Sequence, residues 1–182
     1  MIEINAEDPI ISIRPFDERS LRDATALYNS GSDISYATGM EGSVPISDVK
    51  SHLGFQGQDN DSFAAAIYLK DAGAAAGETG GSFAGMITGA VRGSAVWLRQ
   101  LSIMLGHRRK GLGSRAAKLV IEYLERSCGA SAVFVSVVSE NEPGLLFWKK
   151  LGFIGTYTME KELFGSNRKY SITIMKKTLG SE

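Results

Sequence analysis

The segment from residue 95 to residue 138 constrains the fold of this chain most strongly. Two apolar runs suited to strands, 95–105 and 132–138, enclose a basic loop that contains glycine and a segment with apolar residues at helical spacing. A strand–helix–strand unit of this kind has parallel strands and a right-handed crossover. The loop after the first strand then lies at the carboxyl ends of two parallel strands, where open α/β sheets bind ligands.

The loop itself has the features of an anion site. Residues 105–114 read Leu-Gly-His-Arg-Arg-Lys-Gly-Leu-Gly-Ser. Gly111 and Gly113 have no side chain to keep a ligand away from the main chain. A helix beginning near Gly113 or Ser114 directs its free N–H groups and its positive dipole end toward the loop. The loop therefore predicts a phosphate or pyrophosphate site; the alternative is a surface turn without a ligand, because short motifs of this kind are common.

Residues 111–116 also satisfy the G-x-G-x-x-A dinucleotide pattern, with Glu140 roughly where a ribose-binding acid would fall. In that pattern the first glycine follows its strand almost directly, whereas four basic residues intervene here. After Glu140 the sequence predicts one short helix and a hairpin, without further strand–helix units. The context therefore argues against a Rossmann domain.

Composition narrows the classes of partner. The 182 residues fit one domain, expected to span 1–182. Lys+Arg and Asp+Glu number 20 each, so no net field attracts nucleic acid or a membrane surface, and the basic loop favours a small anionic ligand. One cysteine and two distant histidines predict neither a disulfide framework nor a metal site. No signal peptide or membrane span is evident, so a cytoplasmic location is expected.

Hydrophobic periodicity predicts further strands and helices around the central unit. The run 132–138 is interpreted as a strand buried on both faces. Ser47 and Asn141 are predicted N-caps, Pro143 lies in the first turn after Asn141, and Gly129 is expected to end the helix that follows the basic loop. The other predicted strands are 10–14, 62–69, 83–90, 153–163 and 169–176, and the other predicted helices are 17–29, 47–53 and one from 141 to 152. This order indicates an α/β (α+β) fold with a mixed sheet.

Three motifs in the chain resemble those of the GNAT superfamily of N-acetyltransferases. Residues 108–113, Arg-Arg-Lys-Gly-Leu-Gly, match its acyl-CoA loop, and residues 101–103, Leu-Ser-Ile, are similar to the L-x-V of the preceding strand. Residues 141–153, Asn-Glu-Pro-Gly-Leu-Leu-Phe-Trp-Lys-Lys-Leu-Gly-Phe, are similar to its N-x-x-A-x-x-F/L-Y-x-x-x-G-F segment. The resemblance implies a mostly antiparallel sheet of six to seven strands flanked by about four helices, whose central parallel pair is splayed at the acyl-CoA site.

The resemblance also implies a set of cofactor-binding residues. The pyrophosphate of acetyl-CoA would lie on the backbone amides of 109–114, with Arg108 and Lys110 supplying charge, and the backbone of Ile103 would pair with the pantetheine. Asn141 is explained by its capping role and would also contact the cofactor, whereas Trp148 is either a core residue or a wall at the thioester end. The full set is Leu101, Ile103, Arg108, Arg109, Lys110, Gly111, Leu112, Gly113, Ser114, Asn141 and Trp148.

Two positions depart from the family pattern. The tyrosine that often serves as the acid is replaced by Trp148, whose indole N–H is a donor only. The frequent acidic base on the strand before the loop corresponds to Gln100, which cannot take a proton. Catalysis then rests on positioning and loss of the proton through water, or on another residue. Weak candidates for that residue are Glu41, Tyr157 and Glu140, followed by Asp33, Tyr36 and His107.

The leading hypothesis is an acetyl-CoA-dependent N-acetyltransferase. It would transfer the acetyl group to a primary amine of a small molecule by direct attack in a ternary complex, without a metal. The alternatives are acetylation of a protein or peptide amine and a non-catalytic acyl-CoA-binding regulatory module. The final strands are candidates for pairing across a homodimer.

Overall fold

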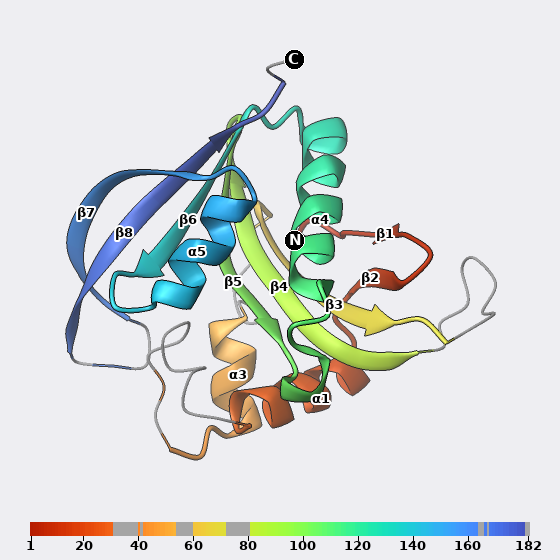
Figure 1. Ribbon diagram of the computed structural model, residues 1–182. Coiled ribbons are helices and arrows are strands. Elements are labelled where there is room, and N and C mark those ends of the chain that lie inside the picture. Colours follow the sequence, from red (N-terminus) through yellow and green to blue (C-terminus); the bar gives the residue numbers. More distant parts are fainter. Residues whose placement is uncertain are drawn as a thin grey trace.

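The fold is built on one eight-stranded sheet. The computed structural model describes residues 1–30, 40, 42–53, 60–71, 81–163, 166 and 168–180. The strand order is β1-β2-β3-β4-β5-β6-β8-β7, and four α-helices within these ranges pack on the sheet (Figure 1). The strands are β1 Ala6–Glu7, β2 Ile11–Pro15, β3 Ser62–Leu69, β4 Ser82–Arg92, β5 Ala95–Ile103, β6 Ala132–Val138, β7 Ile154–Glu162 and β8 Lys169–Thr178. The helices are α1 Glu18–Tyr28, α3 Ile46–His52, α4 Leu112–Cys128 and α5 Glu142–Lys150, none of them long and apolar enough to cross a membrane.

The sheet contains one parallel pair, β5 and β6, and every other neighbouring pair is antiparallel. The parallel pairing runs only from Ala95 opposite Ala132 to Leu98 opposite Val135. Beyond these residues both strands continue but diverge, β5 toward Ile103 and β6 toward Val138 (Figure 1). The predicted parallel unit, and the mixed, mostly antiparallel sheet around it, are confirmed.

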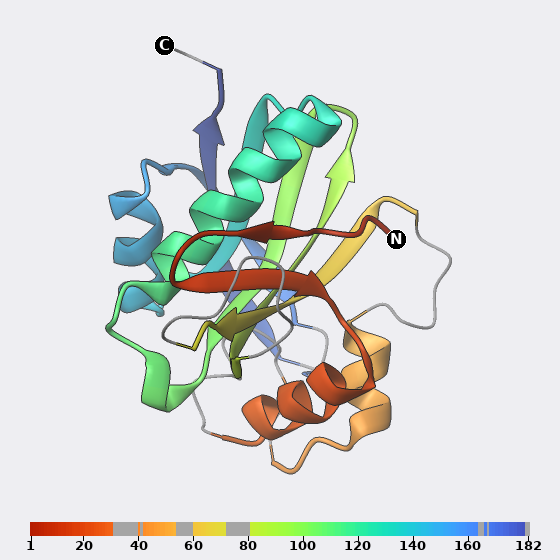
Figure 2. The same ribbon diagram turned by 90° about the vertical axis from the view of Figure 1, so that its right-hand side faces the viewer.

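Helices cover both faces of the sheet. Adjacent residues of a strand point to opposite faces, and Met86 and Ile87 of β4 divide accordingly between two buried clusters. Ile87 packs in the cluster that holds Leu124 of α4 and Trp148 of α5. Met86 packs with residues of α1 and α3. In Figures 1 and 2 the α1–α3 pair accordingly lies apart from α4.

A β-bulge in β5 changes which side chains reach each face. Thr88 of β4 pairs with Gln100, whereas the next residue, Gly89, pairs with Leu98, so Arg99 is an extra residue. Leu98 is therefore buried in the cluster beneath α4. Gln100 and the following alternate residue, Ser102, are also buried, but they face the side of α1 and α3. Without the extra residue, Gln100 would share the face of Leu98.

The helix ends agree with the sequence at two of three predicted positions. Gly129 ends α4 in a left-handed conformation, with φ of 62°. Asn141 caps α5, because its Oδ1 accepts a hydrogen bond from the Gly144 amide at 3.0 Å. The prediction of Ser47 as an N-cap is wrong. Pro45 holds that position in extended geometry, α3 begins at Ile46, and the Ser47 hydroxyl hydrogen-bonds Asp48.

One strand was not predicted from the sequence, and the burial of another differs from the prediction. The sequence did not predict β1, a two-residue strand that pairs with β2. The turn between the two strands contains Asp8, whose Oδ1 accepts hydrogen bonds from the amides of Ile10 and Ile11. β6 is not buried on both faces: Val133 and Val135 are buried, whereas Ser136 is exposed. One face of β6 packs beneath the helices, and the residues on its opposite face up to Ser136 are partly buried or exposed.

Gly89 provides a test of the packing around the bulge. A Cβ at this position would lie 2.5 Å from both the Trp97 carbonyl oxygen and Phe63 Cζ. We expect Gly89→Ala to lower the free energy of unfolding by about 2 kcal/mol in urea titrations, because overpacking a core typically has a penalty of about 1–3 kcal/mol. Gly106→Ala is the control, since a Cβ there meets no atom within 4 Å. Equal destabilisation by both substitutions would contradict the prediction.

Candidate functional site

A cavity of about 1010 Å³ lies where β5 and β6 diverge. One part is bordered by the loop before α4, the first turn of that helix and α5. Another part is bordered by His52 of α3, by Gln100 and Ser102 of β5, and by Glu162 at the end of β7. The cavity therefore joins the predicted anion site to residues on the α1–α3 side of the sheet.

The amino terminus of α4 borders this cavity without a side-chain cap. Gly111 is the N-cap residue, with φ of 77°, a conformation that other residues adopt only with strain. Asp17 and Asn141 cap α1 and α5 with their own side chains, whereas Gly111, the N-cap residue of α4, has no side chain with which to do so. The first-turn amides of α4 are thus available to an anion, and the helix dipole favours negative charge there. The helix begins at Leu112, slightly earlier than predicted.

Two of the loop cations bind nearby backbone carbonyl oxygens, one at the end of β5 and one in the loop itself. Arg108 Nε donates to the carbonyl oxygen of Ile103 at 2.7 Å, and Lys110 Nζ donates to that of Gly106 at 2.8 Å. Arg109 is exposed and has a left-handed φ of 62°. Arg108 and Arg109 line the cavity, whereas Lys110 is not among the described residues that do. These contacts hold the shape of the loop while its charge stays beside the α4 amino terminus.

His107, in the short 3-10 helix Leu105–His107, lies at this part of the cavity. Its Nδ1 is buried and has no hydrogen-bond partner in the described portion of the chain. His107 lines the cavity. A buried nitrogen without a partner is unfavourable, but this atom is not accessible from the cavity and is no evidence for a ligand.

Trp148 is a buried residue that also lines the cavity. It is 8% exposed and packs edge-on against Phe147 and Phe153, with ring centroids 4.9 and 5.0 Å away. It also lines the cavity. Trp148 is thus a core residue whose ring forms part of the cavity wall.

A buried polar network lies at the α1–α3 end of the cavity. The Tyr28 hydroxyl donates to Gln100 Oε1 at 2.9 Å and lies 2.9 Å from His52 Nδ1. Gln100 Nε2 donates to Ser102 Oγ at 3.0 Å. Burial, and secondarily the positive charge of Arg99, lowers the pKa of His52 to about 4, and burial raises the pKa of the Tyr28 phenol. His52 is therefore a neutral imidazole near pH 7.

The cavity brings together all the predicted cofactor-binding residues except Lys110. It does not include the catalytic candidates Glu140, exposed in the turn before α5, or Tyr157, exposed on β7. Glu41, Asp33 and Tyr36 lie outside the described residues.

The sequence analysis missed Tyr28, His52 and Glu162. Glu162 is the one carboxylate among the described residues that line the cavity. Tyr28 lies in the helix predicted over 17–29, and nothing in the sequence indicated a role for its hydroxyl. The one available signal for His52 was the scarcity of histidine, since the chain has two.

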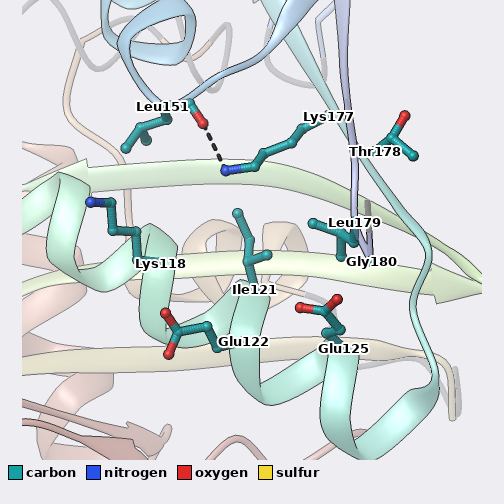
Figure 3. Close-up of a pocket in the computed structure, with 9 residues that line it drawn as sticks. All are labelled: Lys118, Ile121, Glu122, Glu125, Leu151, Lys177, Thr178, Leu179 and Gly180. Carbon is teal, nitrogen blue, oxygen red and sulfur yellow. Dashed lines mark hydrogen bonds between the residues drawn. The ribbon is translucent and has the colours of Figure 1, made fainter. Parts of the chain in front are cut away.

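A second cavity of about 540 Å³ lies between α4 and the end of β8 (Figure 3). Lys118, Glu122 and Glu125 extend toward it from α4, and Lys177 Nζ donates to the Leu151 carbonyl oxygen at 2.9 Å. Its charged residues are exposed or only partly buried, in contrast to the buried network around Tyr28. Within the described residues, no cluster of three His, Cys, Asp or Glu side chains is placed to hold a metal ion. We therefore assign the functional site to the cavity between β5 and β6.

Comparison with known proteins agrees with this geometry. Residues 47–153 match the family described as acetyltransferase (GNAT), which is more than half of the chain. The chain therefore belongs to the GNAT acetyltransferase family and is an acyltransferase. No curated protein sequence matches it.

Several solved structures share the fold at low sequence identity. A spermidine N-acetyltransferase from Vibrio cholerae in complex with CoA and spermine has a TM-score of 0.72 and 14% identity, over 92% of this chain and 95% of that chain. A probable acetyltransferase has a TM-score of 0.75 and 14% identity, over 96% and 97%. A dodecameric spermidine N-acetyltransferase from Vibrio cholerae has a TM-score of 0.67 and 14% identity, over 92% and 93%. Likeness at this identity concerns the fold.

Proposed function

We propose that the protein transfers the acetyl group of acetyl-CoA to a primary amine of a small molecule by direct attack in a ternary complex. The observation that carries this proposal is the single cavity between β5 and β6. It extends from the uncapped amino terminus of α4 to the neutral His52 on the other side of the sheet. A donor and an acceptor bound at the two ends would meet between the diverging strands, where proximity accelerates the reaction.

The donor end fits the chemistry of coenzyme A. The first-turn amides of α4 would bind the pyrophosphate, and Arg108 and Arg109 would add positive charge. The β5–β6 ladder ends at Leu98 and Val135, so the facing backbone groups beyond it, including those of Leu101 and Ile103, are suited to pairing with pantetheine amides. Trp148 would border the thioester end.

The acceptor end fits a small amine. His52 and Arg99 border it from α3 and β5, and Glu162 and the following residue Leu163 border it at the end of β7, so several elements contribute residues to its lining. A carboxylate such as Glu162 suits the ammonium group of an arriving amine. The likeness to structures of spermidine N-acetyltransferases also favours a small-molecule amine over a peptide.

Release of free CoA tests this function. Purified protein with acetyl-CoA is expected to release CoA when supplied with at least one amine of a panel of spermidine, 2-phenylethylamine, tyramine and amino-acid methyl esters. A lysine-containing peptide is expected to react more slowly, because the proposed acceptor is a small molecule. A thiol-reactive dye measures the rate, and reactions without amine give the background. Absence of release above background with every panel amine would contradict the proposal.

The glycine loop can be tested by binding alone. We expect Gly111→Val to abolish the thermal stabilisation by acetyl-CoA, which for the wild type at 100 times Kd is about 2.7 kcal/mol. Gly93→Val is a matched control: Gly93 also has a positive φ and open space around its Cβ position, but it lies in the turn between β4 and β5. Both variants are expected to lose stability, and only Gly93→Val is expected to keep the acetyl-CoA shift. An unchanged shift in Gly111→Val would show that the pyrophosphate lies elsewhere.

We also propose a homodimer through β7. This strand forms one edge of the sheet, all its residues are exposed, and Ile154, Tyr157 and Met159 are 74%, 56% and 42% exposed. An edge strand of this kind is suited to pairing with a second copy. Sedimentation velocity should show a dimer for the wild type and a monomer for Tyr157→Lys/Met159→Lys. Ile10→Lys is the control, because Ile10 is also an exposed apolar residue but lies outside β7, and this variant should remain a dimer. A monomeric wild type would refute this arrangement.

A further inference from the structure

We propose that the acceptor amine also carries a carboxylate, which binds to the Arg99 guanidinium, so that the preferred substrate is an amino acid and not a simple amine or a polyamine. This inference rests on the proposed N-acetyltransferase function and names the chemical class of its acceptor. Arg99 is then a specificity-determining residue at the acceptor end of the cavity, separate from the residues proposed to bind the donor.

The charge of the cavity disfavours a polycationic acceptor. Its described lining contains five cationic side chains and one carboxylate: Arg99, Arg108, Arg109, Lys150 and Lys161 against Glu162. The pyrophosphate of the donor would offset the charge of Arg108 and Arg109 in the loop before α4. At the acceptor end, Arg99 and Lys161 still outnumber Glu162, so this end attracts a negatively charged group on the acceptor.

The bulge in β5 determines where the charge of Arg99 lies. Leu98 is buried on the face covered by α4, and Arg99 is the extra residue before Gln100, which reaches the opposite face. Burial and, secondarily, the positive charge of Arg99 lower the pKa of His52, which agrees with a guanidinium on the side of the sheet where α3 lies. The ladder between β5 and β6 ends at Leu98, so Arg99 lies where the two strands begin to diverge.

The guanidinium of Arg99 has no carboxylate partner within the described ranges. Other arginines do have one: Arg14 pairs with Glu7, Arg92 with Asp61 and Arg115 with Asp8. Arg99 is exposed and lines the cavity, so its charge is available to a ligand. A carboxylate is the fitting ligand, because the planar guanidinium can donate two parallel hydrogen bonds to its two oxygens.

Glu162 provides the opposite charge on another element. It is exposed at the end of β7 and lines the same cavity as Arg99 on β5. An amino acid has one group for each of these side chains: a carboxylate for Arg99 and an ammonium group that Glu162 attracts as the substrate enters. A polyamine has only cationic groups and therefore nothing that binds Arg99.

Amino acids and the amines that lack only their carboxylate test this class of acceptor. The pairs are phenylalanine with 2-phenylethylamine, tyrosine with tyramine, and ornithine with putrescine, each assayed with acetyl-CoA by the release of free CoA. For at least one pair we expect the amino acid to have a kcat/KM about 10-fold higher, the lower end for a hydrogen bond to a charged group, because Arg99 is exposed. The paired amine should still react. A wild type that prefers putrescine or spermidine to every amino acid would overturn the inference.

Substitution of Arg99 assigns the preference to this residue, since the members of a pair also differ in amine basicity. We expect Arg99→Gln to raise the KM for the amino acid about 10-fold and to leave the KM for the paired amine and kcat unchanged. Arg99→Lys, which keeps the charge but not the planar pair of donors, should give an intermediate KM.

Arg22→Gln is the matched control for this experiment. Arg22 is an exposed arginine of α1 and is not among the described residues that line the cavity. The substitution removes the same charge and should leave every KM at its wild-type value. Thermal melts with and without acetyl-CoA show that each variant is folded and binds the donor, which does not depend on Arg99.

The outcomes separate this inference from the function on which it rests. If the wild type releases no CoA with any amine or amino acid, the proposed function fails and the inference about Arg99 fails with it. If the wild type is active, two results would overturn the inference alone: an equal or higher kcat/KM for the amine in every pair, or a preference for the amino acid that Arg99→Gln leaves intact.

Discussion

The extra residue in β5 is the constraint on which the rest of the site depends. With Arg99 bulged out, Leu98 stays in the core beneath α4 while Gln100 and Ser102 reach the opposite face, where α1 and α3 lie. The parallel ladder to β6 ends at Leu98, next to the bulge. A bulge bends its strand and increases the local twist. One residue thus accounts for both the side-chain placement and the start of the divergence that forms the cavity.

The two ends of the cavity use different physical means. At the proposed donor end the polar groups are mainly backbone amides at the start of α4, next to a loop whose Arg108 and Lys110 bind the carbonyl oxygens of Ile103 and Gly106. At the proposed acceptor end they are the hydrogen-bonded side chains of Tyr28, Gln100, Ser102 and His52, together with the charged Arg99 and Glu162. Preorganised amides suit a phosphate anion, and a carboxylate such as Glu162 suits an ammonium group.

The sequence predicted the parts of the fold that depend on local chemistry. The unit from 95 to 138 followed from its periodicity, the end of α4 from Gly129, and the cap of α5 from Asn141. The prediction of an anion site in the loop before α4 rested on the glycines and cations of that loop. Each of these signals is contained within a few neighbouring residues.

The acceptor end could not be predicted in this way. Arg99 has no feature that marks it as a bulge, because the extra residue appears only in the pairing of β5 with β4. Without that register, Gln100 seemed chemically silent, and its contact with Tyr28, 72 residues away, has no local signal. Ser47 was a poor guide to α3, since Pro45, which has no side-chain acceptor, holds the N-cap position and the helix begins at Ile46.

The central claim is that one cavity, between β5 and β6, binds the acyl donor. Backbone amide NMR during titration with acetyl-CoA tests it most directly. The largest shift changes should fall on residues 109–114, at the end of β5 and on residues 135–138. Changes centred instead on Lys118, Glu122 and Gly180, around the cavity of Figure 3, or no changes at saturating acetyl-CoA, would contradict the account.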